Sequence, residues 1–123
     1  MTYRVALDGP IIRVSLSGTL SVADLRSVGR ETEEIERMLG RIPDRIVDMS
    51  GVVATGFAFE ATMEVARRRR EQHFPNAFRS AILAPTKDSV GFARIFQVLS
   101  HNPQIEVKVF ATLREAEEWL GLS

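Results

Sequence analysis

The sequence predicts an α/β protein in which one mostly parallel, five-stranded sheet packs against helices. Short segments of alternating apolar and polar residues are separated by longer segments whose apolar residues recur every three or four positions. The resulting order along the chain is β-β-α-β-α-β-α-β-α. Strands that alternate with helices are joined by right-handed crossovers and form a parallel sheet covered by helices. The first two strands add one antiparallel pair.

Length, charge and cysteine content limit the classes of protein that fit. The 123 residues suit one domain, expected to span residues 1–123. Sixteen basic and sixteen acidic residues cancel, so the overall charge favours neither nucleic acid nor an anionic membrane. The chain has no cysteine, which excludes disulfides, thiolate nucleophiles and cysteine zinc sites. No signal-peptide pattern or membrane-spanning apolar run is present, so we expect a cytoplasmic protein.

The first two strands are predicted as a hairpin around the Asp-Gly-Pro turn at residues 8–10. Their alternating apolar residues are Tyr3, Val5, Leu7, Ile12, Val14 and Leu16. The period then lengthens, and Ser21 followed by Asp24 predicts a helix start. The apolar stripe expected on this helix consists of Val22, Leu25, Val28, Ile35 and Met38. Gly40 and Pro43 are predicted to end the helix.

The middle of the chain is predicted as a short buried strand followed by a helix. Residues 45–49 (RIVDM) form the strand, and residues 57–72 form the helix. The helix is expected to face the core with Phe59, Met63 and Ala66. The residues between the two elements are expected to form a loop.

The last third of the chain is predicted as strand, helix, strand and helix. Residues 78–85 form the first of these strands and residues 104–112 the second. The helix between them carries Phe92, Ile95, Phe96 and Leu99 at amphipathic spacing. The final helix is predicted to begin with a capping box from Thr112 to Glu115, and to bury Ala116, Trp119 and Leu120.

The loops that follow the parallel strands are the expected functional edge, because ligands of such sheets bind at the carboxyl ends of the strands. These loops follow Asp48, Ala84 and Ala111. The candidate binding surface drawn from the loops after the third and fourth strands consists of Asp48, Ser50, Thr55, Gly56, Thr86, Lys87 and Ser89.

The element order and residues 48–52 (DMSGV) resemble the STAS domain family, the fold of anti-sigma factor antagonists. There the third strand commonly ends in Asp-Leu-Ser-Gly-Val or a close variant. The C-terminal half is similar to the SpoIIAA-like (STAS/SEC14-like) branch at residues 81–85, 91–100 and 107–120. The resemblance covers nearly the whole chain, and its motifs are mostly core patterns, which are specific for fold rather than for activity.

This resemblance implies a non-catalytic regulatory module that binds a protein partner through the loops after the third and fourth strands. The SEC14-like branch implies an alternative, a carrier or sensor of a small apolar, lipid-like ligand. Such a carrier needs a cavity between helices and sheet, whereas a pure interaction module has a packed core. A small enzyme is the third hypothesis, for which no acid–base pair or nucleophile set stands out. A homo-oligomer is left open.

The resemblance also bears on phosphorylation, because many STAS regulators carry a phosphorylated serine in an Asp-Ser-Ser-Gly-Leu motif. This chain instead has residues 53–57 (VATGF), in which Thr55-Gly56 is the nearest counterpart and the preceding acid and serine are absent. Thr55 and Ser50 are therefore the candidate phosphoacceptors. The favoured alternative is that Thr55 caps the following helix and that Asp48 braces the turn.

Nucleotide and metal sites are not predicted. Gly51 and Gly56 have the spacing of a P-loop, but Phe57 and Ala58 stand where lysine and a hydroxyl residue must contact phosphate and magnesium. The two histidines, His73 and His101, lack companion ligands at motif spacing. We therefore expect no cofactor and no metal.

Two polar segments each allow two interpretations. Thr86, Lys87 and Ser89 could cradle an anion at a helix start, but an ordinary helix cap is the favoured interpretation. Arg67–Arg70 is the strongest local charge. Four consecutive arginines fan around a helix, so a solvated helix end is favoured over a docking patch for an acidic partner.

Overall fold

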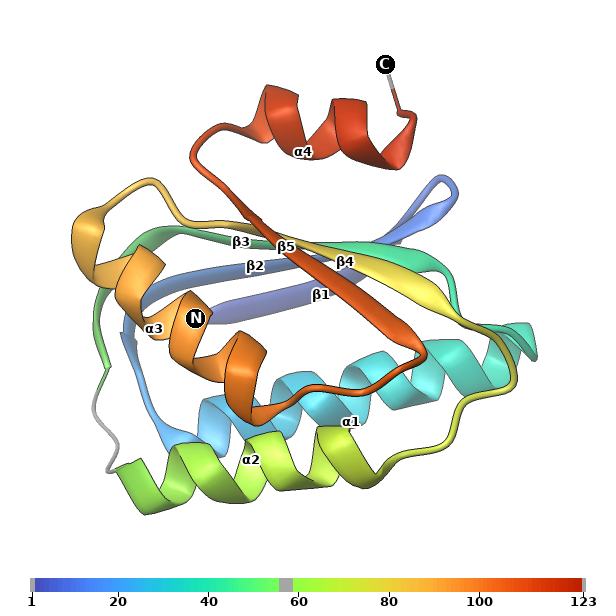
Figure 1. Ribbon diagram of the computed structural model, residues 1–123, viewed down its shortest axis with the longest axis horizontal. Helices are drawn as coiled ribbons and strands as arrows, with labels where there is room; N and C mark the ends of the chain where they lie inside the picture. The colour runs from blue at the N-terminus through green and yellow to red at the C-terminus, as the bar shows by residue number, and fades with distance from the viewer. Residues whose placement is uncertain (1, 56–58, 123) are drawn as a thin grey trace.

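The computed structural model describes the backbone of residues 2–55 and 59–122, and the side chains of residues 2–53 and 63–122. The elements in chain order are β1 (Tyr3–Asp8), β2 (Ile11–Leu20), α1 (Val22–Leu39), β3 (Asp44–Thr55), α2 (Phe59–Glu71), β4 (Phe78–Leu83), α3 (Lys87–Leu99), β5 (Ile105–Phe110) and α4 (Leu113–Leu120). The strands form a five-stranded sheet in the order β1-β2-β3-β4-β5 (Figure 1). The β1–β2 pair is antiparallel, and the remaining pairs are parallel. The predicted fold class is confirmed.

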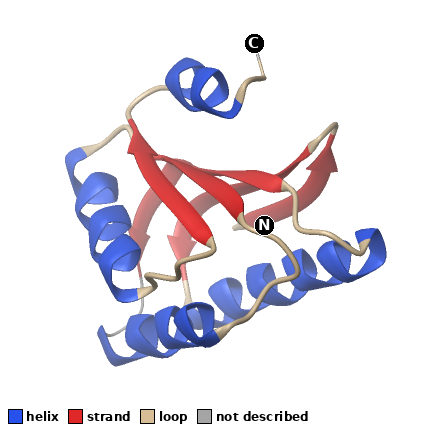
Figure 2. Cartoon of the chain, turned by 45° about the vertical axis from the view of Figure 1, so that its right-hand side comes forward, coloured by secondary structure: helices blue, strands red, loops and turns tan. Residues whose placement is uncertain are grey.

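The helices cover the two faces of the sheet unequally. Helices α1, α2 and α3 lie on one face, and α4 lies on the other (Figures 1 and 2). Each crossover moves to the next strand in the same direction, and right-handed crossovers then place their helices on the same face. The larger core cluster lies between the sheet and α1–α3. Its buried residues are Ile12, Val14, Leu16, Leu20, Met49, Ile82, Ala84 and Ala93.

A second cluster lies on the opposite face, under α4. Its buried residues are Ile11, Ile46, Ala81, Ala116 and Leu120. Helix α4 has only eight residues, too few for independent stability, so its position depends on this packing. Trp119 adds a contact with Phe110, with ring centroids 5.5 Å apart. The sheet is therefore buried on both faces along its central strands.

The predicted helix starts are largely confirmed. Ser21 and Asp24 form a capping box at α1, in which the Asp24 N–H donates to Ser21 Oγ over 3.1 Å. The hydrogen bond from the backbone N–H of Ser21 is the main cause that lowers the pKa of Asp24. At α4, Thr112 Oγ1 accepts from the Glu115 N–H over 3.3 Å. The Glu115 carboxylate accepts from the Thr112 hydroxyl over 2.9 Å, rather than from the backbone as a capping box requires.

The apolar stripe predicted for α1 is wrong at its end. Met38 is 87% exposed, whereas Thr32 and Glu36 are buried. At 100° per residue, Thr32 and Glu36 lie within about 40° of each other around the helix, and Met38 is turned to the opposite side. The inner face therefore includes two polar positions that hydrophobic periodicity passes over.

The extent of β3 corrects the prediction that a loop follows residue 49. The strand continues to Thr55 because β2 runs to Leu20 and offers a parallel partner along this length. Two register shifts, between Ser15 and Ser17 and between Gly18 and Thr19, show that β3 is bulged there. A Cβ at Gly51 would lie 3.0 Å from Ser17 Cβ, so glycine permits this close pairing.

Candidate functional site

Asp48 and Ser50 lie on β3 at the edge where β4 ends. The register places Asp48 opposite Leu83, the last residue of β4. Asp48 Oδ1 accepts two hydrogen bonds from Ser50, one from its N–H over 2.8 Å and one from its hydroxyl over 2.6 Å. The expected bracing role of Asp48 is therefore confirmed, although it braces a bulged strand rather than a loop. Ser50 is exposed at this edge.

Thr86, Lys87 and Ser89 form the start of α3 at the same edge. Thr86 Oγ1 accepts from the Ser89 N–H over 3.1 Å, and Ser89 Oγ accepts from the Thr86 N–H over 3.0 Å. This reciprocal capping box is the interpretation favoured from the sequence. Both hydroxyls are engaged within the cap, and Ser89 is buried. Lys87 is the exposed cation of this set.

The candidate phosphoacceptor segment lies largely outside the described residues. Thr55 ends β3, but its side chain is among those that are not described, as is all of Gly56. The predicted capping role of Thr55 and its alternative role as a phosphoacceptor therefore both stay predictions.

A cavity that the sequence did not reveal lies between the sheet and helices α1–α3. Its volume is about 160 Å³, and its wall is mostly apolar. Residues that line it from α1, α3 and the sheet include Leu25, Val28, Met49, Ile82, Phe92 and Phe96, and α2 contributes Val65, Arg68 and Arg69. Hydrophobic spacing predicted Leu25, Val28, Phe92 and Phe96 as the apolar faces of their helices, but spacing alone does not show whether the side chains fill the space between them.

Two arginines line this cavity, Arg45, which is buried, and Arg69, which is half-buried. Arg45 on β3 is 5% exposed, and its Nη2 donates to the carboxylate of Glu36, which is also 5% exposed. Its guanidinium lies 5.0 Å from the centre of the Phe78 ring. Arg69 on α2 lies 5.7 Å from the Phe74 ring centre. Both arginines line the cavity.

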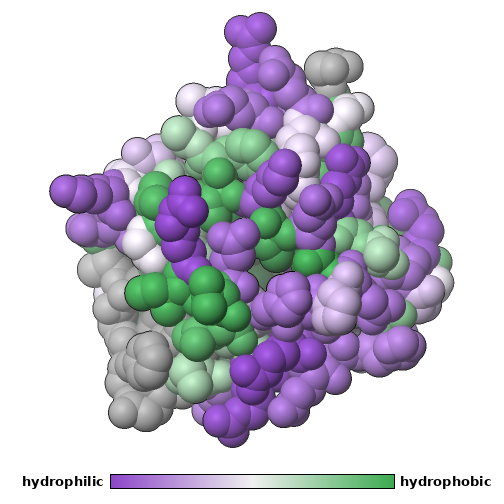
Figure 3. Space-filling view, viewed as in Figure 1, coloured by the Kyte–Doolittle hydropathy of each residue, from purple (hydrophilic) through white to green (hydrophobic). Residues whose placement is uncertain are grey.

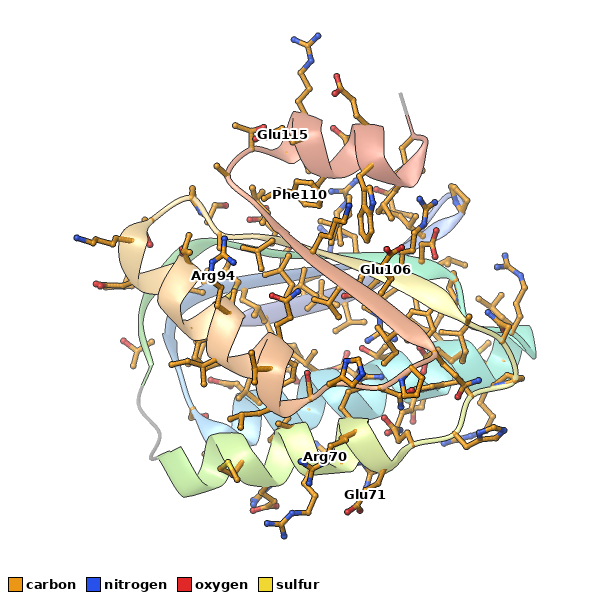
Figure 4. All side chains as sticks on the ribbon, viewed as in Figure 1. Arg70, Glu71, Arg94, Glu106, Phe110 and Glu115 are labelled. Atoms are coloured by element: carbon orange, nitrogen blue, oxygen red, sulfur yellow. The ribbon has the colours of Figure 1, made fainter. Side chains whose placement is uncertain are left out.

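Each of these arginines has a nitrogen without a hydrogen-bond partner. Arg45 Nε and Arg69 Nη1 are inaccessible to solvent and contact no acceptor among the described residues. The expectation that Arg67–Arg70 is a solvated helix end is wrong for Arg69, because it turns inward, whereas Arg68 and Arg70 are exposed. The exposed Arg70 points away from the sheet in Figure 4.

The burial of these charges shifts their pKa values. Burial lowers the pKa of Arg45 to about 9, assisted by the positive charge of Arg69 and opposed by Glu36. Burial also lowers the pKa of Arg69. The pKa of Glu36 is raised, because burial outweighs its attraction to Arg45 and Arg69. Arg45 nevertheless keeps its positive charge at neutral pH.

The outer rim of this charged cluster joins α1 to α2. The Glu33 carboxylate accepts from Arg68 Nη2 over 3.0 Å and from Gln72 Nε2 over 3.0 Å. Arg68 therefore has its own carboxylate partner, and Glu36 is left to face both Arg45 and Arg69. Among the described side chains of this cluster, three arginines face two glutamates, which leaves one positive charge in excess.

Two further classes of site can be compared with the structure. Among the described side chains, those of residues 2–53 and 63–122, no three His, Cys, Asp or Glu residues gather where they could hold a metal ion. His73 and His101 are both exposed. Within the same ranges, no helix has both the length and the apolar character needed to cross a bilayer.

Comparison with known proteins places the fold. No family model matches the sequence, and no curated protein matches it. Solved structures that are similar over nearly the whole chain include the following three. An uncharacterised protein with a SpoIIAA-like fold from Shewanella loihica PV-4 has a TM-score of 0.60 and 16% identity, covering 96% of this chain and 91% of that one.

The other two structures are anti-sigma factor antagonists. SpoIIAA in its unphosphorylated form has a TM-score of 0.59 and 13% identity, and 97% of each chain is covered. An antagonist from Mycobacterium paratuberculosis has a TM-score of 0.57 and 14% identity, covering 98% of this chain and 93% of that one. The agreement in element order and strand topology confirms the resemblance in fold: this chain has the SpoIIAA-like fold of the STAS domain.

Proposed function

We propose that this chain is a non-catalytic, STAS-like regulatory module that binds a small, largely apolar ligand between its sheet and helices α1–α3. The cavity of about 160 Å³ is the observation that carries this proposal. Protein interiors are close-packed, and an empty space of this size lowers stability. A module that acts through its surface alone gains nothing from such a space, whereas a carrier or sensor requires it.

Gly29, a glycine of α1 that lines the cavity, is a second observation that supports the proposal. It lies on the inner face of the helix and lines the cavity, and a Cβ at this position would have nothing within 4 Å. Glycine in a helix interior costs about 1 kcal/mol relative to alanine. A methyl group would fit here and stabilise the helix, whereas a larger side chain would occupy space that a ligand needs.

Benzene is a suitable first probe, because an apolar cavity of about 150 Å³ is large enough to bind it. We expect benzene to shift the methyl NMR signals of Leu25, Val28 and Ile82 in a saturable way. Gly29→Leu, which fills the cavity, should abolish these shifts while the protein stays folded. Gly91→Leu is the matched control, since Gly91 is an exposed helix glycine with open space around it. Benzene binding that is absent from the unmodified protein, or unchanged in Gly29→Leu, would contradict the proposal.

The edge of the sheet at Asp48, Ser50 and Lys87 is proposed as the surface for a protein partner. By sequence, Thr55, Gly56, Thr86 and Ser89 belong to the same edge. Two of the structures with this fold are anti-sigma factor antagonists, which supports a protein partner. An apolar area lies over the neighbouring helix α3, where Ile95 is 50% and Val98 is 75% exposed (Figure 3).

A charge reversal at this edge tests the partner surface. We expect Lys87→Glu to remove a partner that co-purifies with the unmodified chain from its source cell, because the reversed charge would repel the acidic contact surface that Lys87 is proposed to attract. Arg114→Glu is the control, because Arg114 is exposed on α4 and its ion pair is with Glu118 of the same helix. Equal recovery of the partner by both variants would exclude this edge as the contact surface.

A further inference from the structure

The two arginines that line the cavity, Arg45 and Arg69, indicate which chemical group the ligand carries. We propose that the ligand is a small apolar carboxylate, with its apolar part among the side chains of α1–α3 and the sheet and its carboxylate on Arg45 and Arg69. This inference rests on the proposed function, because it assumes that the cavity is a binding site.

The first argument is the pair of unused donors. Arg45 Nε and Arg69 Nη1 are buried without an acceptor, and both residues line the same cavity. A buried donor that loses its bond to water and gains no other costs free energy, so buried polar atoms are rarely left in this state. Guanidinium groups match the planar geometry of a carboxylate, and such charge-assisted bonds are among the strongest in proteins.

The second argument is the balance of charge. Arg68 is paired with Glu33 and Arg45 with Glu36, and Arg69 forms no ion pair of its own among the described side chains, although both glutamates attract it. One added negative charge would neutralise the cluster. A carboxylate supplies that single charge, whereas a phosphate monoester carries about −1.5 to −2 at neutral pH and would overcompensate it.

The third argument is the size and polarity of the space. The wall is mostly apolar beyond the arginines, and the volume of about 160 Å³ compares with the roughly 150 Å³ cavity that holds benzene. The apolar part of the ligand is therefore about as large as a benzene ring or a short alkyl chain. Benzoate combines this size with one carboxylate and is the natural probe.

Benzamide provides the matched comparison, because it has nearly the same shape as benzoate and carries no charge. We expect the protein at pH 7 to bind benzoate at least about 10-fold more tightly than benzamide, as measured by NMR titration. Arg69→Met should remove this preference and leave the affinity for benzamide unchanged. Arg69→Lys, which keeps the charge, should retain part of the preference and guards against misfolding of the methionine variant.

Arg70→Met controls for the general effect of removing a positive charge from α2. Arg70 is the next residue on the helix, is exposed, and points away from the sheet (Figure 4). We expect this variant to keep the preference for benzoate. An equal loss of preference in Arg70→Met and Arg69→Met would show that the overall field acts rather than a direct contact, and would overturn the inference.

The remaining outcomes separate the inference from the proposed function. Equal affinity for benzoate and benzamide would overturn the carboxylate assignment but leave the cavity as a site for apolar ligands. Binding of neither benzoate, benzamide nor benzene would overturn the assignment and the proposed function together. Benzoate binding that survives unchanged in Gly29→Leu would place the acid outside the cavity and would also overturn the assignment.

Discussion

Replacing Arg45 with methionine is expected to lower the free energy of unfolding at pH 7 by about 3–5 kcal/mol. The side chains of Arg45 and Glu36 are 6% and 5% exposed, so the substitution leaves a buried carboxylate without its hydrogen-bonded partner. The packing of the guanidinium on the Phe78 ring is lost as well. Urea denaturation followed by circular dichroism measures the change.

The double variant Arg45→Met/Glu36→Leu serves as the control for this prediction. Exchanging a whole buried ion pair for apolar side chains of similar volume is often neutral or stabilising. We therefore expect the double variant to regain most of the stability that the single variant loses. A single variant within about 1 kcal/mol of the unmodified protein would show that the pair is not isolated from solvent.

The same variant has a defined dependence on pH. Burial already raises the pKa of Glu36, and loss of the adjacent positive charge of Arg45 raises it further. The folded state then holds the Glu36 proton at pH values where the unfolded state has released it. The stability deficit of Arg45→Met should therefore shrink as the pH falls from the Glu36 pKa of the folded variant to the lower, though also raised, Glu36 pKa of the folded unmodified protein, and grow as the pH rises across the same window.

Ile46→Ala is the second large effect, with an expected loss of about 2–5 kcal/mol in the free energy of unfolding. Ile46 is 0% exposed in the central strand β3 and packs in the cluster beneath α4. Removal of its outer carbons leaves a space that strands on both sides prevent from collapsing. Thermal or urea unfolding gives the magnitude.

Val53→Ala is the matched control on the same strand. Val53 is 83% exposed, so its truncation should change stability by no more than about 0.5 kcal/mol. A loss at Val53 comparable to that at Ile46 would contradict the exposed position of the distal part of β3.

Local patterns in the sequence predicted most of the fold, because they act between near neighbours. A capping box needs only residues three positions apart, as at Ser21 and at Thr86. Alternation over five or six residues was enough to identify β1 and β5, and a short apolar run before Pro85 identified β4. Each of these signals is independent of the rest of the chain, which explains why they were confirmed.

Features that depend on a distant partner were not predicted. β3 continues past residue 49 because β2 extends to Leu20 and pairs with it along this length. The sequence of residues 50–55 alone does not show how far β2 extends. The pairing of Glu36 with Arg45 joins a helix to a strand across nine positions. Arg45 lies in a strand that was predicted as buried, but a charged side chain is normally exposed, and nothing in the sequence predicts that Glu36 is buried as its partner.

The candidate site also has parts that local sequence patterns predict and parts that depend on distant contacts. Sequence identified the polar edge at Asp48 and Thr86 because polar residues after buried strands are visible as a pattern. The inward turn of Arg69 was within reach, since four successive arginines must place at least one toward the sheet if α2 packs there. The run of four charges instead favoured the interpretation that all four arginines are solvated. The open space of the cavity depends on side-chain packing in three dimensions and has no linear signature.

The order of strands in the sheet also bears on how the chain folds. Because strand order follows chain order, each strand pairs with the strand that precedes it in the sequence, with no more than one helix between them. Pairings between segments that are close in sequence cost little loop-closure entropy, so we expect the sheet to assemble from the β1–β2 hairpin outward. Helix α4 packs on the face that carries Ile46 and Ala81, and until it docks, that face is an exposed apolar surface.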